Sequence, residues 1–158
     1  MPPPPVHPLY CGGGLPSINK KPYSSRYNLD LTRIPNHDMK NGMEEYLRTH
    51  SMIKGIVAGT RRTDPFSAHL CAFCHTDNGW PEFTRINPIL DWEYQDVWRV
   101  MLTFKIPYCH LYDRGYTSLG SVHNTHPNPY LRSEGGFLPA FNLQDGSHER
   151  DGRLTKEA

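Results

Sequence analysis

Short periodic stretches of apolar residues predict a few regular elements in this chain. Residues 29–34 alternate apolar and polar positions, which predicts a short strand. Asp38 then precedes apolar residues at helical spacing, which predicts a helix that ends near His50. Residues 52–59 are almost all apolar, as in a strand covered on both faces of a parallel sheet. Strand, helix and strand in succession predict a right-handed crossover unit.

A second helix is predicted after a long stretch without periodicity. Residues 59–87 carry Gly, Pro, Thr, Asp and Asn in no sustained pattern, which predicts a loop. A loop directly after a buried strand is a common ligand site in open α/β sheets. Asp91 is suited to cap the next helix. The apolar face of that helix comprises Tyr94, Val97, Trp98, Met101 and Leu102. Past Lys105 the composition again predicts loops.

The composition is that of one loop-rich domain. The chain has 158 residues with 13 glycines and 15 prolines, and only 37% are hydrophobic. This length is typical of a single domain. Residues 1–27 are rich in proline and glycine and predict an irregular N-terminal segment. We expect an α/β domain over residues 28–131 and a C-terminal tail over residues 132–158.

The charge and the cysteines narrow the class of protein. A formal net charge of +1 gives no reason to expect a nucleic-acid-binding surface. No apolar run approaches the ~20 residues that span a bilayer, and the N-terminus lacks a signal-peptide pattern. We therefore expect a cytoplasmic monomer that binds neither nucleic acid nor membrane. In that compartment the four cysteines are expected to be reduced: Cys11, Cys71, Cys74 and Cys109.

The residues at the end of the second predicted strand suit a nucleotide ligand. Gly59 lets a ligand approach the backbone, and Arg61 and Arg62 offer forked donors for phosphate. Asp64 can accept a hydrogen bond from a ring N–H. The spacing alone is equally compatible with a solvated turn that contains a surface ion pair.

Several motifs, taken in order, resemble the eukaryotic, particularly fungal-type, FAD synthases (FMN adenylyltransferases) of the PAPS-reductase-like PP-loop family. They are GTRRTDPF, TDNGWPEFTRINPILDW, YQDVW, PYCHLYDRGYTSLG, NTHPNPYL and the tail PAFNLQDGSHERDGR. The resemblance covers roughly residues 27–131 and 138–153. It implies an open, mostly parallel sheet with flanking helices and long ligand loops. It also implies that the phosphate of FMN attacks the α-phosphate of Mg-ATP, giving FAD and pyrophosphate.

The resemblance also implies the site residues. FMN would be bound by Asp64, Asp77, Trp80, Arg85, Arg150 and Arg153. Asp77 and Arg150 would be catalytic, and Gly59 and Arg61 would bind the ATP phosphates. No resident metal is implied, because Mg²⁺ enters with ATP. These residue types suit the chemistry. Arginines offset the charge that develops on the phosphate oxygens. The flavin ring can stack on tryptophan, and its N–H can donate to a carboxylate.

One motif of this family has no counterpart in the chain. Members begin with a strand and an SGGxDS-type loop that cradles the ATP phosphates, whereas Gly12 to Gly14 follow prolines and precede Leu15. We therefore expect an N-terminally truncated fold that carries the flavin-binding half, with weak or no turnover. The alternatives are a second chain that supplies the ATP site, and a non-catalytic binding module or fragment. A sulfonucleotide reductase would need a cysteine near the C-terminus, and none follows Cys109.

The sequence Cys71-Ala72-Phe73-Cys74-His75 raises two further alternatives. As a bare pattern, C-x-x-C-H is the attachment signature of c-type haem, which requires export. A zinc ion could instead use Cys71 and Cys74 with His69, His75 or Cys109. No second C-x-x-C pair occurs, so free thiols are favoured.

Other residues within the matching motifs suit architectural roles. Trp98 is expected in the core, and Asn124 and Asn128 in turns. Tyr112 and Tyr116 belong to a loop that, by the resemblance, lies beside the active site. The sequence leaves open whether they contact the ligand or only brace it.

Overall fold

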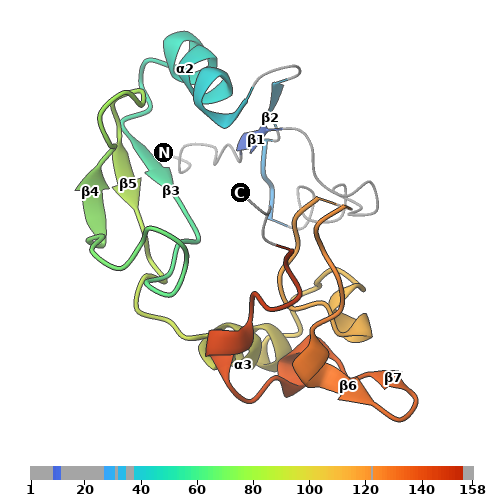
Figure 1. Ribbon diagram of the computed structural model, residues 1–158. Helices are drawn as coiled ribbons and strands as arrows, with labels where there is room; N and C mark the ends of the chain where they lie inside the picture. The colour runs from blue at the N-terminus through green and yellow to red at the C-terminus, as the bar shows by residue number, and fades with distance from the viewer. Residues whose placement is uncertain (1–8, 12–26, 31, 35–37, 122, 155–158) are drawn as a thin grey trace. The chain divides into compact units, whose positions relative to one another are not determined.

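The structure is a computed structural model that describes residues 9–11, 27–30, 32–34, 38–121 and 123–154 (Figure 1). The prediction of an irregular segment over residues 1–27 falls largely outside these ranges. The chain divides into two compact units. The first comprises residues 1–58 and 71–88, and the second comprises residues 59–70 and 89–158.

The first unit contains two small sheets. In one of them, β1 (Leu9–Cys11) runs parallel to β2 (Thr32–Ile34). In the other, β5 (Thr84–Ile86) is the middle strand. It runs parallel to β3 (Gly55–Val57) and antiparallel to β4 (Phe73–His75). The long loop predicted over residues 59–87 therefore contains two strands, β4 and β5. Strands of three residues are too short to show a period of two in the sequence.

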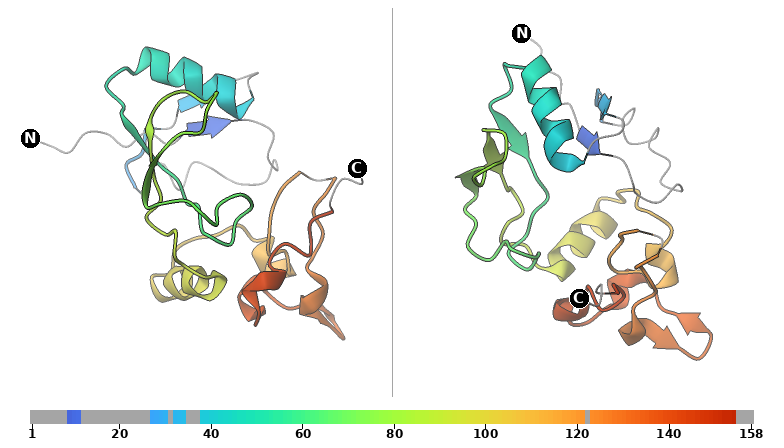
Figure 2. Two further views of the ribbon diagram at one scale, coloured as in Figure 1. Left: turned by 60° about the vertical axis from the view of Figure 1, so that its left-hand side comes forward. Right: turned by 45° about the horizontal axis from the view of Figure 1, so that its top comes forward.

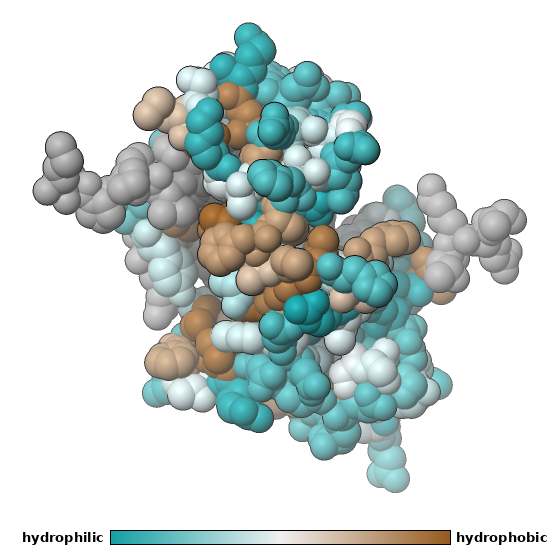
Figure 3. All heavy atoms as spheres, turned by 90° about the vertical axis from the view of Figure 1, so that its left-hand side faces the viewer, coloured by the Kyte–Doolittle hydropathy of each residue, from teal (hydrophilic) through white to brown (hydrophobic). Residues whose placement is uncertain are grey.

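The strand–helix–strand prediction is correct for the elements and wrong for their pairing. Strands β2 and β3 lie within the predicted stretches, but they belong to different sheets and do not form the crossover unit. The side chain of Val57 in β3 is 67% exposed, whereas we expected a strand covered on both faces. Among the described strands β3 pairs with β5 alone, so it lies at the edge of its sheet. Phe73 of β4 is also 68% exposed, and apolar side chains gather on the side that carries β4 and β5 (Figure 3).

Helix α2 (Met39–Thr49) confirms the first helix prediction. Asp38 is its N-cap, and the Asp38 Oδ1 atom accepts a hydrogen bond of 2.8 Å from the backbone N–H of Asn41. His50 closes the helix, because its backbone N–H donates to the carbonyl of Tyr46. The ring of Tyr46 is buried and stacks on the His50 ring at 4.2 Å. A local cap and one buried face are sufficient to define this helix.

The second unit is built around α3 (Tyr94–Thr103). The helix begins later than predicted, with Glu93 as its N-cap in place of Asp91. The backbone N–H of Glu93 donates to Asp96 Oδ2 at 3.0 Å. The carboxylate of Asp91 is instead engaged by Arg62 Nε at 2.5 Å.

The core of the second unit is an aromatic cluster around Trp98, which is 8% exposed, as predicted. Its ring makes edge-to-face contacts with those of Tyr108 at 5.2 Å, Tyr112 at 5.3 Å and Phe141 at 5.9 Å. The predicted loop past Lys105 wraps α3 in short turns and one hairpin (Figure 2). These are η1 (Tyr112–Arg114), η2 (Pro129–Leu131), β6 (Arg132–Ser133), β7 (Gly136–Phe137), η3 (Ala140–Asn142) and η4 (Gly146–His148).

Candidate functional site

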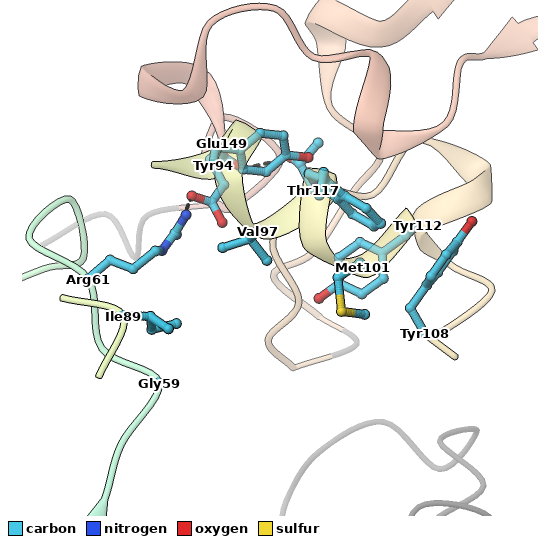
Figure 4. A pocket seen from close by; sticks show the side chains of 11 residues that line it. Gly59, Arg61, Ile89, Tyr94, Val97, Met101, Tyr108, Tyr112, Thr117 and Glu149 are labelled. Atoms are coloured by element: carbon cyan, nitrogen blue, oxygen red, sulfur yellow. Dashed lines mark hydrogen bonds and ion pairs between the residues drawn. The ribbon is translucent and has the colours of Figure 1, made fainter. Parts of the chain in front are cut away.

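A partly buried ion-pair network lies at the start of the second unit, in the turn that follows Gly59. The Arg61 side chain is 9% exposed, and its Nη2 donates to Glu149 Oε2 at 2.5 Å (Figure 4). The same Nη2 donates to Asp64 Oδ1 at 3.3 Å. The backbone N–H of Arg61 also donates to Asp64 Oδ2 at 2.9 Å. One guanidinium is therefore enclosed by two carboxylates, one of which comes from 88 residues further along the chain.

Burial and pairing act in opposite directions on this network. Burial raises the pKa of the Glu149 carboxyl, and the ion pair with Arg61 offsets only part of that rise. Burial also works against the charge of Arg61, but Glu149 and Asp64 outweigh it and raise the pKa of the guanidinium. Arg61 therefore keeps its charge, while Glu149 holds a proton more readily than an exposed glutamate does.

A cavity of about 230 Å³ lies beside this network, within the second unit. Figure 4 shows aromatic side chains along one part of its lining and Arg61 with Glu149 at another. The Tyr94 hydroxyl donates to the carbonyl of Ala140 at 2.9 Å, and burial raises the pKa of Tyr94 far above its ordinary value. This lining offers a largely apolar, aromatic surface with a few polar groups, as ligand sites commonly do.

The segment that carries the tail arginines is fastened to the rest of the second unit by buried hydrogen bonds. Asn128 is fully buried, and its Nδ2 donates to the carbonyl of His148 at 2.7 Å and to Thr117 Oγ1 at 2.8 Å. The Thr117 hydroxyl in turn donates to the carbonyl of Glu149 at 2.6 Å. The ring of Tyr130 stacks on that of His148 at 3.8 Å. Asn128, expected as a turn former, caps η2 and also holds this segment.

The two tail arginines differ in their surroundings. Arg150 is exposed. Arg153 is half-buried, its Nη1 lies 3.5 Å from Ser118 Oγ, and its guanidinium lies against the Cα of Gly120. The buried Nε of Arg153 has no hydrogen-bond partner among the described residues. Both side chains thus keep hydrogen-bonding capacity that a phosphate could use.

Three predicted flavin residues lie together in the first unit. Arg85, in the middle strand β5, donates from Nη2 to Asp77 Oδ2 at 2.6 Å. The backbone N–H of Trp80 donates to the carbonyl of Asp77 at 3.0 Å, and Gly79 completes this turn with φ +84°. The Asp77 side chain is 73% exposed and the Trp80 residue is 38% exposed. A carboxylate and an indole face are therefore both available to a ligand.

The predicted site residues fall into two groups, one within each unit. Asp77, Trp80 and Arg85 form the first group. The second comprises Gly59, Arg61, Asp64, Arg150 and Arg153. Sequence reasoning missed Glu149, Thr117 and Tyr94. Only the place of Glu149 next to Arg150 in the tail motif could have pointed to it.

The cysteine alternatives gain no support from the described residues. Cys71, Cys74 and Cys109 are free thiols. The Nδ2 of Asn87 donates to the carbonyl of Cys71 at 3.0 Å and lies 3.7 Å from Cys74 Sγ. Among the residues that the structure describes, no three His, Cys, Asp or Glu side chains are placed to hold a metal ion. None of the described helices is long and apolar enough to cross a membrane.

Comparison with known proteins identifies the family. The model of the phosphoadenosine phosphosulfate reductase domain matches residues 21–127, more than half of the chain. A probable FAD synthase of Schizosaccharomyces pombe is 48% identical over 130 residues, which are 82% of this chain and 49% of that protein. The flavin adenine dinucleotide synthase of Saccharomyces cerevisiae is 36% identical over 116 residues, 70% of this chain and 38% of that protein. The chain thus spans about half or less of the length of these relatives.

A solved structure supports the same assignment. The crystal structure of Candida glabrata FMN adenylyltransferase in complex with FMN and the ATP analogue AMPCPP is similar with a TM-score of 0.86 and 27% identity. The similarity covers 94% of this chain and 69% of that one. The predicted α/β class, with an open sheet and flanking helices, is therefore confirmed. The chain belongs to the phosphoadenosine phosphosulfate reductase domain family.

Proposed function

We propose that this chain binds FMN for the transfer of AMP from Mg-ATP to FMN. In that reaction a phosphate oxygen of FMN attacks the α-phosphorus of ATP, the bond between the α- and β-phosphates breaks, and FAD and pyrophosphate form. The observation that carries the proposal is the exposed indole of Trp80 beside the carboxylate of Asp77. The similarity to an enzyme solved with FMN and an ATP analogue supports it.

Within the first unit we assign the flavin ring to Asp77, Trp80 and Arg85. An indole face stacks on a planar ring, and a carboxylate accepts from the imide N–H at the ring edge. Arg85 orients the Asp77 side chain through its hydrogen bond of 2.6 Å. An oxygen of that side chain can then accept from the ring N–H.

Within the second unit we assign the FMN phosphate to Arg150 and Arg153, and a flavin contact to Asp64. Phosphoryl transfer asks a protein mainly for positioning and for cations that offset developing oxygen charge. The exposed guanidinium of Arg150 can approach a phosphate without losing a buried partner. Gly59 lines the cavity beside Arg61, where a ligand could approach the backbone.

A titration of FMN with the full chain tests the flavin site through quenching of flavin fluorescence. Replacing Trp80 with alanine should weaken FMN binding about tenfold or more, because base–aromatic stacking contributes ~1–3 kcal/mol. Phe104→Ala is the matched control, since Phe104 is an exposed aromatic residue, at 68%, outside the proposed site. Equal FMN affinity in wild type and the Trp80 variant would refute the assignment of the ring to Trp80.

A chromatographic assay for FAD tests the transfer step. We expect this chain alone to form FAD slowly or not at all, because it contains no SGGxDS-type sequence to cradle the ATP phosphates. Rapid FAD formation would contradict that expectation and would assign ATP binding to residues present in this chain. We further propose a cytoplasmic monomer that binds neither nucleic acid nor membrane; the near-neutral net charge supports the part of this proposal that concerns nucleic acid.

A further inference from the structure

The geometry points to Glu149 as a positioning residue that, held by Arg61, fixes the adjacent Arg150 for contact with the FMN phosphate. This inference rests on the proposed function and adds a residue to it. Glu149 and Arg150 are neighbours in the chain, but their side chains differ in exposure, because that of Glu149 is 20% exposed and Arg150 is exposed. A partly buried, fixed residue directly before an exposed cation is a means of directing that cation.

The charges around Arg61 disfavour a role for it in phosphate binding. Its guanidinium contacts Glu149 at 2.5 Å and Asp64 at 3.3 Å, so one positive charge faces two carboxylates. When both carboxylates are ionised, they more than balance the charge of Arg61, which leaves that guanidinium little attraction for a phosphate. The donors of Arg61 are directed at protein carboxylates. The structure therefore favours Arg61 as an anchor for Glu149 over a role as a phosphate ligand.

The backbone around Glu149 is also held by hydrogen bonds. Its carbonyl accepts from Thr117 Oγ1 at 2.6 Å, and its N–H donates to the carbonyl of Gly146 at 3.0 Å. The carbonyl of Arg150 accepts from the N–H of Arg153 at 2.8 Å. Main chain and side chain of Glu149 are thus both held, so the Cα of Arg150 has little freedom. Loss of the side-chain anchor would leave Arg150 to sample more positions.

A comparison of FMN with riboflavin binding separates an effect on the position of Arg150 from a general loss of stability. Riboflavin has the ring of FMN without the phosphate, so its binding does not report on Arg150. In Glu149→Gln the amide retains an oxygen acceptor for Arg61, but the ion pair is lost. We expect the dissociation constant for FMN to rise about tenfold and that for riboflavin to change by less than about twofold. Glu134→Gln is the matched control, because Glu134 is exposed in the turn between β6 and β7.

A double-mutant cycle with Arg150→Ala makes the test specific. If Glu149 acts through Arg150, then Glu149→Gln has no further effect on FMN affinity once Arg150 is removed. If Glu149→Gln does not fold, as judged by its thermal melt, Arg61→Lys disrupts the same pair more mildly and should give the same selective loss for FMN. Unchanged FMN affinity in the folded variant would overturn the inference, as would equal losses for FMN and riboflavin or additive effects in the cycle. A wild-type chain that binds neither flavin would instead refute the proposed function, and the inference with it.

Discussion

Replacing Asn128 with alanine removes three hydrogen bonds from the interior of the second unit. The Nδ2 group donates to the carbonyl of His148 at 2.7 Å and to Thr117 Oγ1 at 2.8 Å, and Oδ1 accepts from the N–H of Tyr130 at 3.0 Å. Asn128 is fully buried, so water cannot replace these bonds without a rearrangement. The variant should therefore lose both stability and the attachment of the tail segment.

The expected loss follows from the number of bonds. Each of the three hydrogen bonds contributes ~1 kcal/mol, so their loss lowers the free energy of unfolding by ~3 kcal/mol. Polar groups left without a partner in the variant can raise this loss to ~5 kcal/mol. The free energy of unfolding of a typical domain is ~5–15 kcal/mol, so this single change removes a large share of the stability. With a urea m-value of ~2 kcal/mol/M, the unfolding midpoint should fall by about 1.5 M.

Urea unfolding followed by tryptophan fluorescence measures this loss, because Trp92 and Trp98 both lie in the second unit. Asn142→Ala is the matched control. Asn142 makes one side-chain donation of 3.2 Å to the carbonyl of Pro139, and its replacement should cost only ~1 kcal/mol. If the Asn128 variant loses no more stability than this control, the hydrogen bonds of Asn128 do not hold the tail segment as described here.

Three further changes probe other parts of the molecule. Trp98→Ala should destabilise the chain by ~3–5 kcal/mol, because the ring is the centre of the aromatic cluster; a loss below ~1 kcal/mol in urea unfolding would contradict that role. Gly120→Ala should weaken FMN binding with little change in the thermal midpoint, because the new Cβ overlaps the flexible guanidinium of Arg153; unchanged FMN affinity would argue against Arg153 as a ligand. Burial raises the pKa of Glu149, so the folded chain binds this proton more tightly than the unfolded chain, and the Glu149 contribution to stability should fall as pH rises above 4.5. Urea unfolding from about pH 4 to about pH 7 should show this slope in wild type and lose it in Glu149→Gln.

The sequence predicted elements well where the signal is local. The cap at Asp38 and the spacing of the apolar residues after it define α2 to within a residue at each end. The start of α3 was misplaced, because Asp91 is an equally good cap by type but is engaged by Arg62 at 2.5 Å. Strand pairing was predicted least well, since three-residue strands carry no period, and the partners in the pairs β1–β2 and β3–β5 lie far apart in the sequence.

The same division holds for the candidate site. Asp77 and Trp80 are three residues apart, and one turn places both, so a local motif can specify their arrangement. The pair of Arg61 with Glu149 joins residues 88 positions apart, and no periodicity or motif records it. The phosphate role predicted for Arg61 rested on its side-chain type and on the family resemblance. The structure shows that two carboxylates accept hydrogen bonds from Arg61. Arg150 is therefore the better candidate for contact with the phosphate.

Thermal unfolding of the full chain with and without FMN tests the central claim most directly. A ligand that binds only the folded state raises its stability, by ~2.7 kcal/mol at a hundredfold excess over the dissociation constant. We predict one or more cooperative transitions, at least one of which moves to higher temperature as FMN is added. A chain that melts without any shift at saturating FMN, or that shows no cooperative transition, would contradict it.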